Sequence, residues 1–394
     1  MASQGDSIDG ESSLYLAAIR IFLLNEQSGV FLASKRLETT KTLSLASLQT
    51  CRQCREATSF HVRITDGTPR GVWAPRALIA VGTANEHQAH EGRESSATTS
   101  LMASATRVPA VKIGKITWEA SSPAEHLFAP AVTGEFSWLH EVAFGEKFDL
   151  NADGIAWPDR LRRLTFKSSF SHPVSDIAWP SGLEQLELDG RFNQTIVGSI
   201  WPASLRQLSF GYYFNHPVVG VAWPTSLRQL SFGWQFDQNL DGMVLPSMLE
   251  VLAIVGVYNR PLDRVRLPAS LKSLTLGGNF NQSLASCEFP EGLESLFLGW
   301  AFDQPLDGVA WPPRLKTLVF GYRFHQGPSN VKFPPRLETL ELSVFSRQSL
   351  KGLVWPPSLK TLKVGRAFDL TGMVLPEGAR VCRRGHATCQ IAKR

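Results

Sequence analysis

Apolar residues recur at a fixed spacing over more than half of the chain. A proline appears every 22 residues, followed by leucine three and six positions later and by a large apolar residue eight positions later. The evenly spaced prolines are Pro158, Pro180, Pro202, Pro224, Pro246, Pro268, Pro290, Pro312, Pro334 and Pro356, and Pro376 follows after a shorter interval of 20. A repeat of about 20 to 50 residues is typical of a solenoid, in which each repeat forms one coil.

The spacing inside a repeat predicts the shape of the coil. Leu205 and Leu208 are three residues apart, but Leu208 and Phe210 are two apart, as in a strand whose alternate side chains share a face. We therefore expect short parallel strands at 207–210 and at the equivalent positions. A residue before proline is held extended and proline lacks a backbone N–H, so the return side should be extended or turn-like, without a long helix.

Two polar columns follow the same period. The position four after the proline alternates in charge through Arg228, Glu250, Lys272, Glu294, Lys316, Glu338 and Lys360. Equivalent residues of in-register parallel coils lie about 4.8 Å apart, so opposite charges there would form a ladder. An aromatic residue twelve after the proline is usually followed by Asn or Asp, which can bond neighbouring backbone groups and hold a turn. Because these polar residues repeat in every coil, a structural role is favoured over catalysis or metal binding.

The chain divides into four predicted parts. Residues 1–82 form an N-terminal region of unknown fold, 83–115 a flexible linker, 116–376 the solenoid and 377–394 a basic tail. The N-terminal region lacks the repeat, and its patterns predict a helix over 14–24 and short strands at 60–64 and 78–81. Leu139, Val142, Phe144 and Phe148 match the repeat one period before Pro158 and predict an atypical first coil.

Composition excludes several functional classes. The net charge is +5, and the tail 377–394, with five basic residues and one acidic residue, accounts for four of these charges. The solenoid therefore has no basic field for a nucleic acid. The apolar run 14–24 is too short for a membrane span, and the acidic N-terminus does not resemble a secretory signal, so we expect a cytoplasmic protein.

The sequence gives no indication of an enzyme, a metal or a cofactor. Five cysteines are too few and too scattered for a disulfide framework. Neither Cys51 with Cys54 nor Cys382 with His386 and Cys389 supplies the four ligands of a structural zinc site. The motifs GxSxG, HExxH and the P-loop are absent.

The repeat resembles a known family. Leu-x-x-Leu-x-Leu/Phe with a 22-residue period resembles leucine-rich repeats, and the endings Phe-Asn-Gln at 192–194, Phe-Asn-His-Pro at 214–217 and Phe-Asp-Gln-Pro at 302–305 resemble the FNIP repeat. The resemblance covers roughly residues 136–376 and implies a leucine-rich-repeat-like solenoid that acts as a protein-interaction module. Some members carry an N-terminal F-box, which residues 14–24 do not convincingly match.

Aromatic side chains beyond the strands are the candidate binding residues. Exposed Trp and Tyr are the types most enriched in binding hot spots, and an adjacent arginine adds polar specificity. The candidates are Tyr212, Tyr213, Trp234, Trp300, Tyr322 and Arg323, expected on the strand face. Alternatively, these rings lie over the neighbouring coil and shield its core. The favoured function is a non-enzymatic scaffold for a protein or peptide, and the alternative is a carbohydrate-binding solenoid.

Overall fold

The computed structural model describes residues 60–64, 113–118, 139–146, 148–149, 151–167, 169–326, 332–342, 354–365, 373–383 and 389–391. The predicted helix over 14–24 and the predicted strand at 78–81 lie outside these residues. All regular elements of the described residues are strands. The chain forms two compact units: Met1–Leu150 with Gly154–Phe166, and Asn151–Asp153 with Lys167–Arg394.

The first unit contains four strands that pair in parallel in sequence order: β1 (Phe60–Ile64), β2 (Ile113–Trp118), β3 (Glu141–Phe144) and β4 (Arg163–Phe166). β1 coincides with the predicted strand at 60–64, whereas β2 begins inside the range 83–115 that the sequence analysis assigns to a linker. Leu139, Val142, Phe144 and Phe148 are each at most 1% exposed. The repeat therefore begins one period before Pro158, as predicted.

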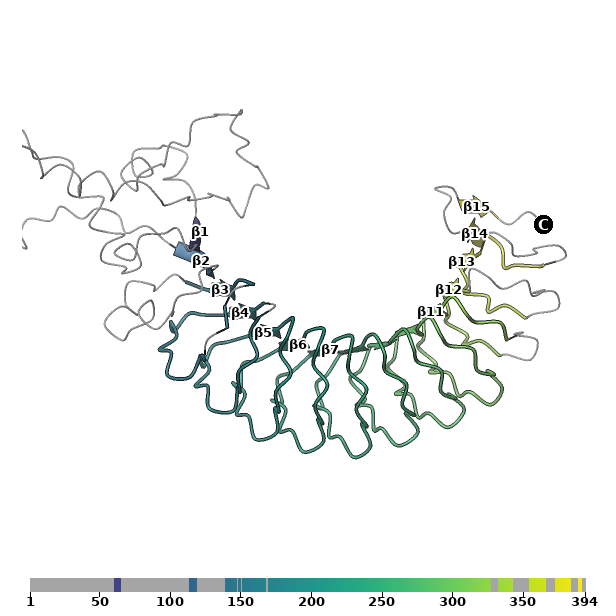
Figure 1. Ribbon diagram of the computed structural model, residues 1–394. Coiled ribbons are helices and arrows are strands. Elements are labelled where there is room, and N and C mark those ends of the chain that lie inside the picture. Colours follow the sequence, from purple (N-terminus) through teal and green to yellow (C-terminus); the bar gives the residue numbers. More distant parts are fainter. Residues whose placement is uncertain are drawn as a thin grey trace, which may run out of the picture. The chain divides into compact units, whose positions relative to one another are not determined.

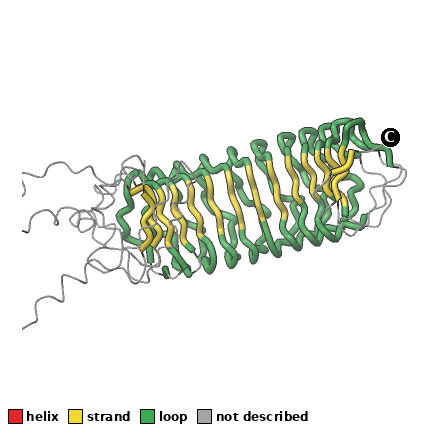
Figure 2. The backbone as a smooth tube through the Cα atoms, turned by 90° about the horizontal axis from the view of Figure 1, so that it is seen from above, coloured by secondary structure: helices red, strands yellow, loops and turns green. Residues whose placement is uncertain are grey.

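The second unit is a stack of coils, each contributing one short strand (Figure 1). The strands are β5 (Gln185–Leu188), β6 (Gln207–Phe210), β7 (Gln229–Phe232), β8 (Val251–Ile254), β9 (Ser273–Leu276), β10 (Ser295–Phe297), β11 (Thr317–Val319), β12 (Thr339–Glu341), β13 (Thr361–Val364), β14 (Arg380–Arg383) and β15 (Cys389–Ile391). Those from β5 to β14 pair in parallel with their neighbours. The strands form one row on the inner side of the stack, with loops along both edges of the row (Figures 1 and 2).

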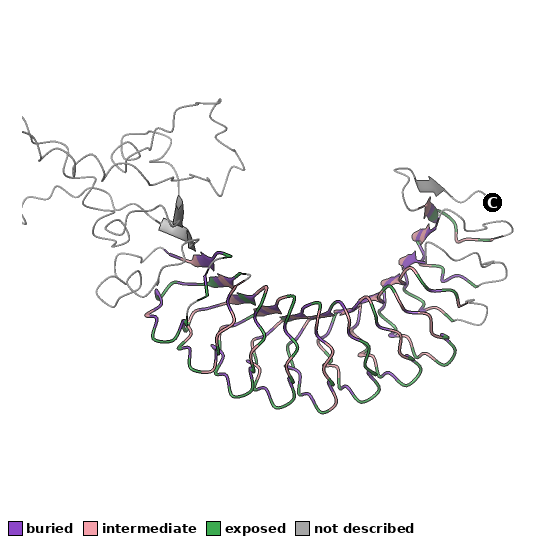
Figure 3. Ribbon diagram, in the orientation of Figure 1, coloured by how far each residue is buried: buried purple, intermediate pink, exposed green. Residues whose placement is uncertain are grey.

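Neighbouring strands pair so that residues 22 positions apart lie opposite each other. Leu208 lies opposite Leu230, and Leu230 lies opposite Leu252. The coil of β7 shows how the core is built: Leu227, Leu230, Phe232 and Phe236 are each at most 1% exposed. Burial of each large apolar side chain stabilises the fold by about 1.5–3 kcal/mol. Buried residues lie on the strands and also on the return side of the coils, whereas exposed residues gather at the outer turns (Figure 3).

A column of aromatic rings runs through this core, twelve residues after each proline. Its members are Phe170, Phe192, Phe214, Phe236, Tyr258, Phe280, Phe302 and Phe324, and neighbouring ring centroids are 6.0 to 6.3 Å apart. The column packs one ring on the next from coil to coil.

The alternating charges form the predicted ladder. The Glu250 carboxylate accepts hydrogen bonds from Arg228 at 2.5 Å and from Lys272 at 2.8 Å. Lys316 bonds Glu294 at 2.9 Å, and Lys360 lies 2.8 Å from Glu338. Hydrogen bonds from Lys272 and then Arg228 lower the pKa of Glu250. Because these pairs are exposed, they specify register more than they add stability.

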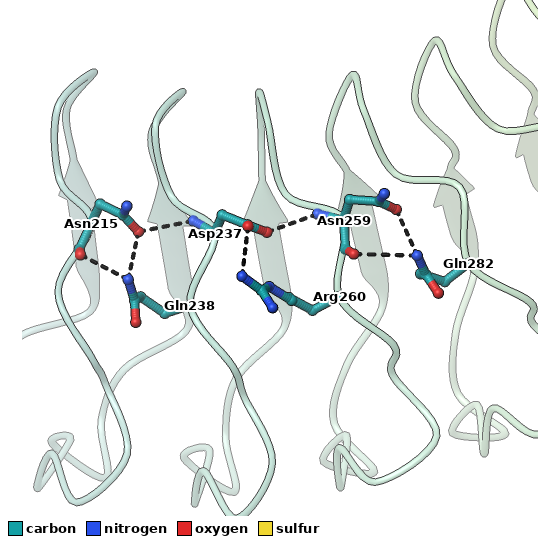
Figure 4. A network of polar contacts seen from close by, with 6 residues as sticks. All are labelled: Asn215, Asp237, Gln238, Asn259, Arg260 and Gln282. Atoms are coloured by element: carbon teal, nitrogen blue, oxygen red, sulfur yellow. Dashed lines mark hydrogen bonds and ion pairs between the residues drawn. The ribbon is translucent and has the colours of Figure 1, made fainter.

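A second polar ladder follows the aromatic column (Figure 4). The side-chain oxygen of Asn215 accepts the backbone N–H of Asp237 at 3.0 Å, and Asp237 accepts that of Asn259 at 3.1 Å. The same bond recurs between the equivalent residues 193 and 215, 259 and 281, 281 and 303, and 303 and 325. The Asn and Asp residues therefore bond backbone, as predicted, but in the next coil rather than in their own turn.

The residue that directly follows a ladder residue bonds the ladder residue of the preceding coil. Gln238 and Gln282 donate to the amide oxygens of Asn215 and Asn259, whereas Arg260 pairs with the Asp237 carboxylate at 3.0 Å (Figure 4). In these coils an amide follows an amide and a cation follows a carboxylate, whereas Gln326 follows Asp303 and donates to its backbone carbonyl at 3.1 Å. Each of these bonds ties one coil to the next.

The unit ends with an antiparallel hairpin. β15 pairs antiparallel with β14, and Cys382 lies opposite Cys389 in the backbone register. Cys382 is disulfide-bonded. The sequence analysis did not anticipate this cross-link.

Candidate functional site

The aromatic candidates lie just beyond the ends of the strands. Tyr212 and Tyr213 form the turn after β6, Trp234 follows β7, Trp300 follows β10, and Tyr322 follows β11. They therefore lie on the turns just beyond the strand ends, next to the strand face on which the sequence analysis expected them. Together they form an aromatic rim, which consists of Tyr212, Tyr213, Trp234, Trp300 and Tyr322.

The backbone of the aromatic rim is fixed by bonds between coils. The N–H of Gln235 donates to the Tyr212 carbonyl at 2.9 Å, and the N–H of Val257 donates to the Trp234 carbonyl at 2.8 Å. The Trp300 carbonyl accepts the N–H of Arg323 at 3.0 Å. The turns therefore continue the backbone ladder of the sheet.

Close approach of successive turns explains the glycine before each rim tryptophan. A Cβ on Gly233 would lie 1.8 Å from the Gly211 carbonyl oxygen, and one on Gly299 would lie 1.6 Å from that of Gly277. No side chain fits at such a separation. These glycines let the coils stack and hold the next residue at the surface.

The rings form two clusters. In the early cluster, Tyr212 stacks on Trp234 with centroids 6.2 Å apart and planes within 1°, and Tyr213 meets Tyr212 edge-on at 4.9 Å. In the late cluster, Trp300 and Tyr322 are edge-to-face at 5.1 Å. Arg323 is exposed beside the late cluster.

Most of these rings are open to solvent. Tyr212 is 46% exposed, Tyr213 and Trp234 are each 49% exposed, and Trp300 is 67% exposed. Tyr322 is half-buried against Trp300. The rings of the neighbouring core column are completely buried, so the aromatic rim holds the large exposed rings of the described residues.

Two glycines separate the clusters along the rim. The position held by Trp234 and Trp300 is occupied by Gly256 and Gly278 in the two intervening coils. Gly256 has a φ of 85°, and a Cβ there would lie 2.1 Å from the Trp234 carbonyl oxygen. A Cβ on Gly278 would meet only the Gly256 carbonyl oxygen, at 3.4 Å. The backbone thus requires glycine at 256 but not at 278.

The strand face beside the rim carries uncharged side chains, small ones near the early cluster and larger apolar ones near the late cluster. Ser209 and Ser231 lie next to the early cluster, and Phe297 and Val319 lie on the strands next to the late cluster. Two carboxylates stand on the strand face seven residues after a repeat proline: Glu187 is exposed on β5, while Glu341 is 6% exposed on β12 with Lys363 3.6 Å away.

Two side chains of a potentially reactive type, Cys287 and His216, belong to the core packing and to the polar ladder. Burial raises the pKa of the Cys287 thiol to about 11, which disfavours the reactive thiolate. The His216 ring contacts the Asn193 carbonyl at 3.1 Å as part of the polar ladder. Within the described residues, no three His, Cys, Asp or Glu side chains gather as metal ligands, and no helix could span a membrane.

Sequence reasoning missed a set of exposed aliphatic residues on the return side. Ile200, Val244, Val354 and Val374 are 79 to 83% exposed and stand two residues before a proline. Other coils hold Ala, Arg, Glu or Lys at this position, so comparison within the column could have identified them.

Comparison with known families confirms the FNIP resemblance. The model described as "FNIP Repeat" matches residues 214–254, 258–301 and 302–344. These segments are similar to the FNIP repeat, and they contain the polar ladder from Asn215 onward together with Trp234, Trp300 and Tyr322. A search of curated proteins gives no significant match.

Solved structures similar to this chain are leucine-rich-repeat proteins. One is CroV588, described as a novel circular leucine-rich-repeat structure, with 24% identity, a TM-score of 0.42 and coverage of 68% of this chain and 49% of that one. This chain thus spans about half the length of that protein. Another is an internalin (inlF) from Listeria monocytogenes str. 4b F2365, with 14% identity, a TM-score of 0.48 and coverage of 70% and 81%.

Proposed function

We propose that this protein is a non-enzymatic scaffold that binds a protein or peptide partner through the aromatic rim. The observation that carries the proposal is the set of four exposed rings, Tyr212, Tyr213, Trp234 and Trp300, on turns held by backbone bonds between coils. A repeat solenoid of the leucine-rich type is typical of interaction scaffolds, which agrees with this use.

The energetics favour such a surface as a binding site. Trp and Tyr are enriched among the few interface residues that supply most of the binding free energy. Ordering side chains on binding costs about 0.5–1.5 kcal/mol for each flexible group, and the ring contacts within each cluster reduce this cost beforehand. Arg323 adds a cation beside the late cluster.

A protein partner is favoured over a sugar. Sugar rings stack on an open aromatic face, but Tyr212 and Trp234 turn their faces toward each other. Of the two strand-face carboxylates that could bond sugar hydroxyls, Glu341 is buried beside Lys363. Carbohydrate binding remains the alternative outcome of the experiment below.

The test is affinity capture from native lysate with the full chain, beside a variant in which Tyr212, Trp234, Trp300 and Tyr322 are all replaced by alanine. We expect a protein that the parent retains and the variant loses. Circular dichroism must show that the variant keeps its strand content.

A matched control removes apolar surface elsewhere. Ile200→Ala, Val244→Ala and Val354→Ala together delete side chains that are 79 to 83% exposed on the return side. This variant should retain the partner. Equal capture by all three proteins, or elution by free oligosaccharide, would contradict protein binding at the aromatic rim.

A further inference from the structure

We propose that the partner contributes an extended peptide segment that places two large apolar side chains, four residues apart, on the two clusters of the aromatic rim. This inference rests on the proposed function and adds the conformation and spacing of the ligand. It follows from the separation of the clusters, the glycines between them and the bonding of the rim backbone.

The separation of the clusters is set by the coil repeat. Trp234 and Trp300 occupy the same position in coils that are three steps apart, with β8 and β9 in the coils between them. Neighbouring strands lie about 4.8 Å apart, so equivalent positions three steps apart are separated by about 14 Å.

Only some peptide conformations match this separation. In an extended chain, residues i and i+4 point to the same side and are about 13 Å apart. A helix repeats a face at i+7 or i+11, about 10 or 16 Å along its axis. A polyproline II helix repeats at i+3 or i+6, about 9 or 19 Å. The extended chain therefore fits best.

The glycines between the clusters accommodate the middle of such a segment. Residue i+2 of an extended chain points to the same side as the two anchors, toward Gly256 and Gly278. The backbone does not require glycine at 278, because a Cβ there would contact one carbonyl oxygen at an ordinary 3.4 Å. Absence of a side chain at 278 leaves room for residue i+2.

The rim contacts the segment through its side chains and not through backbone hydrogen bonds. The carbonyls of Trp234, Gly256 and Gly278 already accept N–H groups of the next coil at 2.8, 3.0 and 2.7 Å. Asn279 is exposed beside the gap and is uncharged, so the middle of the segment needs no charge. Arg323 favours an acidic residue next to the anchor that meets Trp300.

The experiment selects peptides from a phage library of random twelve-residue sequences on the immobilised full chain. We expect enriched peptides to carry two large apolar residues at i and i+4. A synthetic peptide of that pattern should bind at least ten times more weakly when the spacing becomes i+3 or i+5, and about 30 times more weakly to Trp234→Ala or Trp300→Ala.

Two further variants test whether weaker peptide binding comes from loss of the proposed contacts or from a general loss of fold. Gly278→Leu fills the gap beside Trp300 while every residue of the aromatic rim stays in place, and it should weaken the peptide at least tenfold. The triple variant Ile200→Ala, Val244→Ala, Val354→Ala should bind like the parent. Unchanged binding to Gly278→Leu would overturn the passage of the peptide over the gap.

The remaining outcomes distinguish the two levels of the proposal. Enrichment of i+7 or i+3 patterns that still depend on Trp234 and Trp300 would overturn the extended segment and leave the binding site intact. Peptides indifferent to both tryptophans, or no enrichment at all, would overturn the extended segment; retention of a lysate protein by the quadruple alanine variant would in addition overturn the aromatic rim as the site.

Discussion

The hydroxyl group of Tyr258 is the exception in an otherwise apolar column of rings. Tyr258 is fully buried between Phe236 and Phe280, and its hydroxyl has no hydrogen-bond partner in the part of the chain that the structure describes. Burial raises the pKa of Tyr258 far above its usual value, so the group stays neutral. A buried polar atom without a partner destabilises the folded state.

Tyr258→Phe is therefore expected to raise the free energy of unfolding by about 1 kcal/mol. Urea denaturation followed by tryptophan fluorescence measures the change. The reverse substitution Phe280→Tyr, at the equivalent position of the next coil, should lower stability. A loss of stability in Tyr258→Phe would show that the hydroxyl is bonded in solution.

Two glycines one coil apart should respond differently to alanine. Gly299→Ala brings a methyl group against the Gly277 carbonyl oxygen and should cost about 1–3 kcal/mol by forcing the turns apart. Gly278→Ala makes only an ordinary contact and should change stability by less than about 0.5 kcal/mol. Similar losses in the two variants, measured by chemical denaturation, would contradict this account of the rim backbone.

At the scale of the coil, the ladder of alternating charges should make the stability of the stack depend on pH. The pKa of Glu250 lies below its ordinary value of 4.5 in the folded protein, so its contribution is present above that pH and is lost as pH falls through the folded-state value. Glu250→Gln should lower the urea midpoint at pH 7 and have less effect at pH 3. Added salt should shrink the pH 7 difference. An equal effect at both pH values would show that charge is not responsible.

The sequence predicts the elements well where one residue type recurs. The spacing of Leu205, Leu208 and Phe210 predicts β6 to the residue, because a buried face permits one alternation of side chains. The alternating charges predict the ladder, because one row of like charges would repel. Periodicity cannot show in which coil a bond ends, so the step from Asn215 to the backbone of Asp237 was not foreseen.

The candidate residues and their place beyond the strand ends were predicted from the sequence, but the close approach of successive turns was not. Residue type identifies Tyr212, Trp234, Trp300 and Tyr322, since Trp and Tyr are enriched in binding hot spots. The close approach of Gly233 to Gly211, which requires glycine before Trp234, is a distance between turns of neighbouring coils. The spacing of residues along the sequence does not reveal the distance between turns of neighbouring coils.

At the scale of the whole second unit, stability should be shared between neighbouring coils. Each coil contacts mainly the coils before and after it, as the strand order shows, so a local defect spreads over a short range. Leu230 is fully buried in the coil of β7, and Leu230→Ala should cost about 2–5 kcal/mol.

Hydrogen exchange can follow how far that defect spreads. In Leu230→Ala, amide protection should fall most in β6, β7 and β8 and least in β12 and β13. A uniform loss of protection across all strands would mean that the unit unfolds as one cooperative body.

The bonding of the rim backbone also bears on how such a surface can diversify. Because the main chain of each turn is already bonded to its neighbours, the residue that follows the turn glycine can be exchanged without disturbing the fold. Under the proposed function, the positions 234, 256, 278 and 300 would each present one side chain to the ligand, and the backbone tolerates a new side chain at all of them except 256. Repeats of this kind can acquire new ligands by single substitutions, while the stack beneath them stays the same.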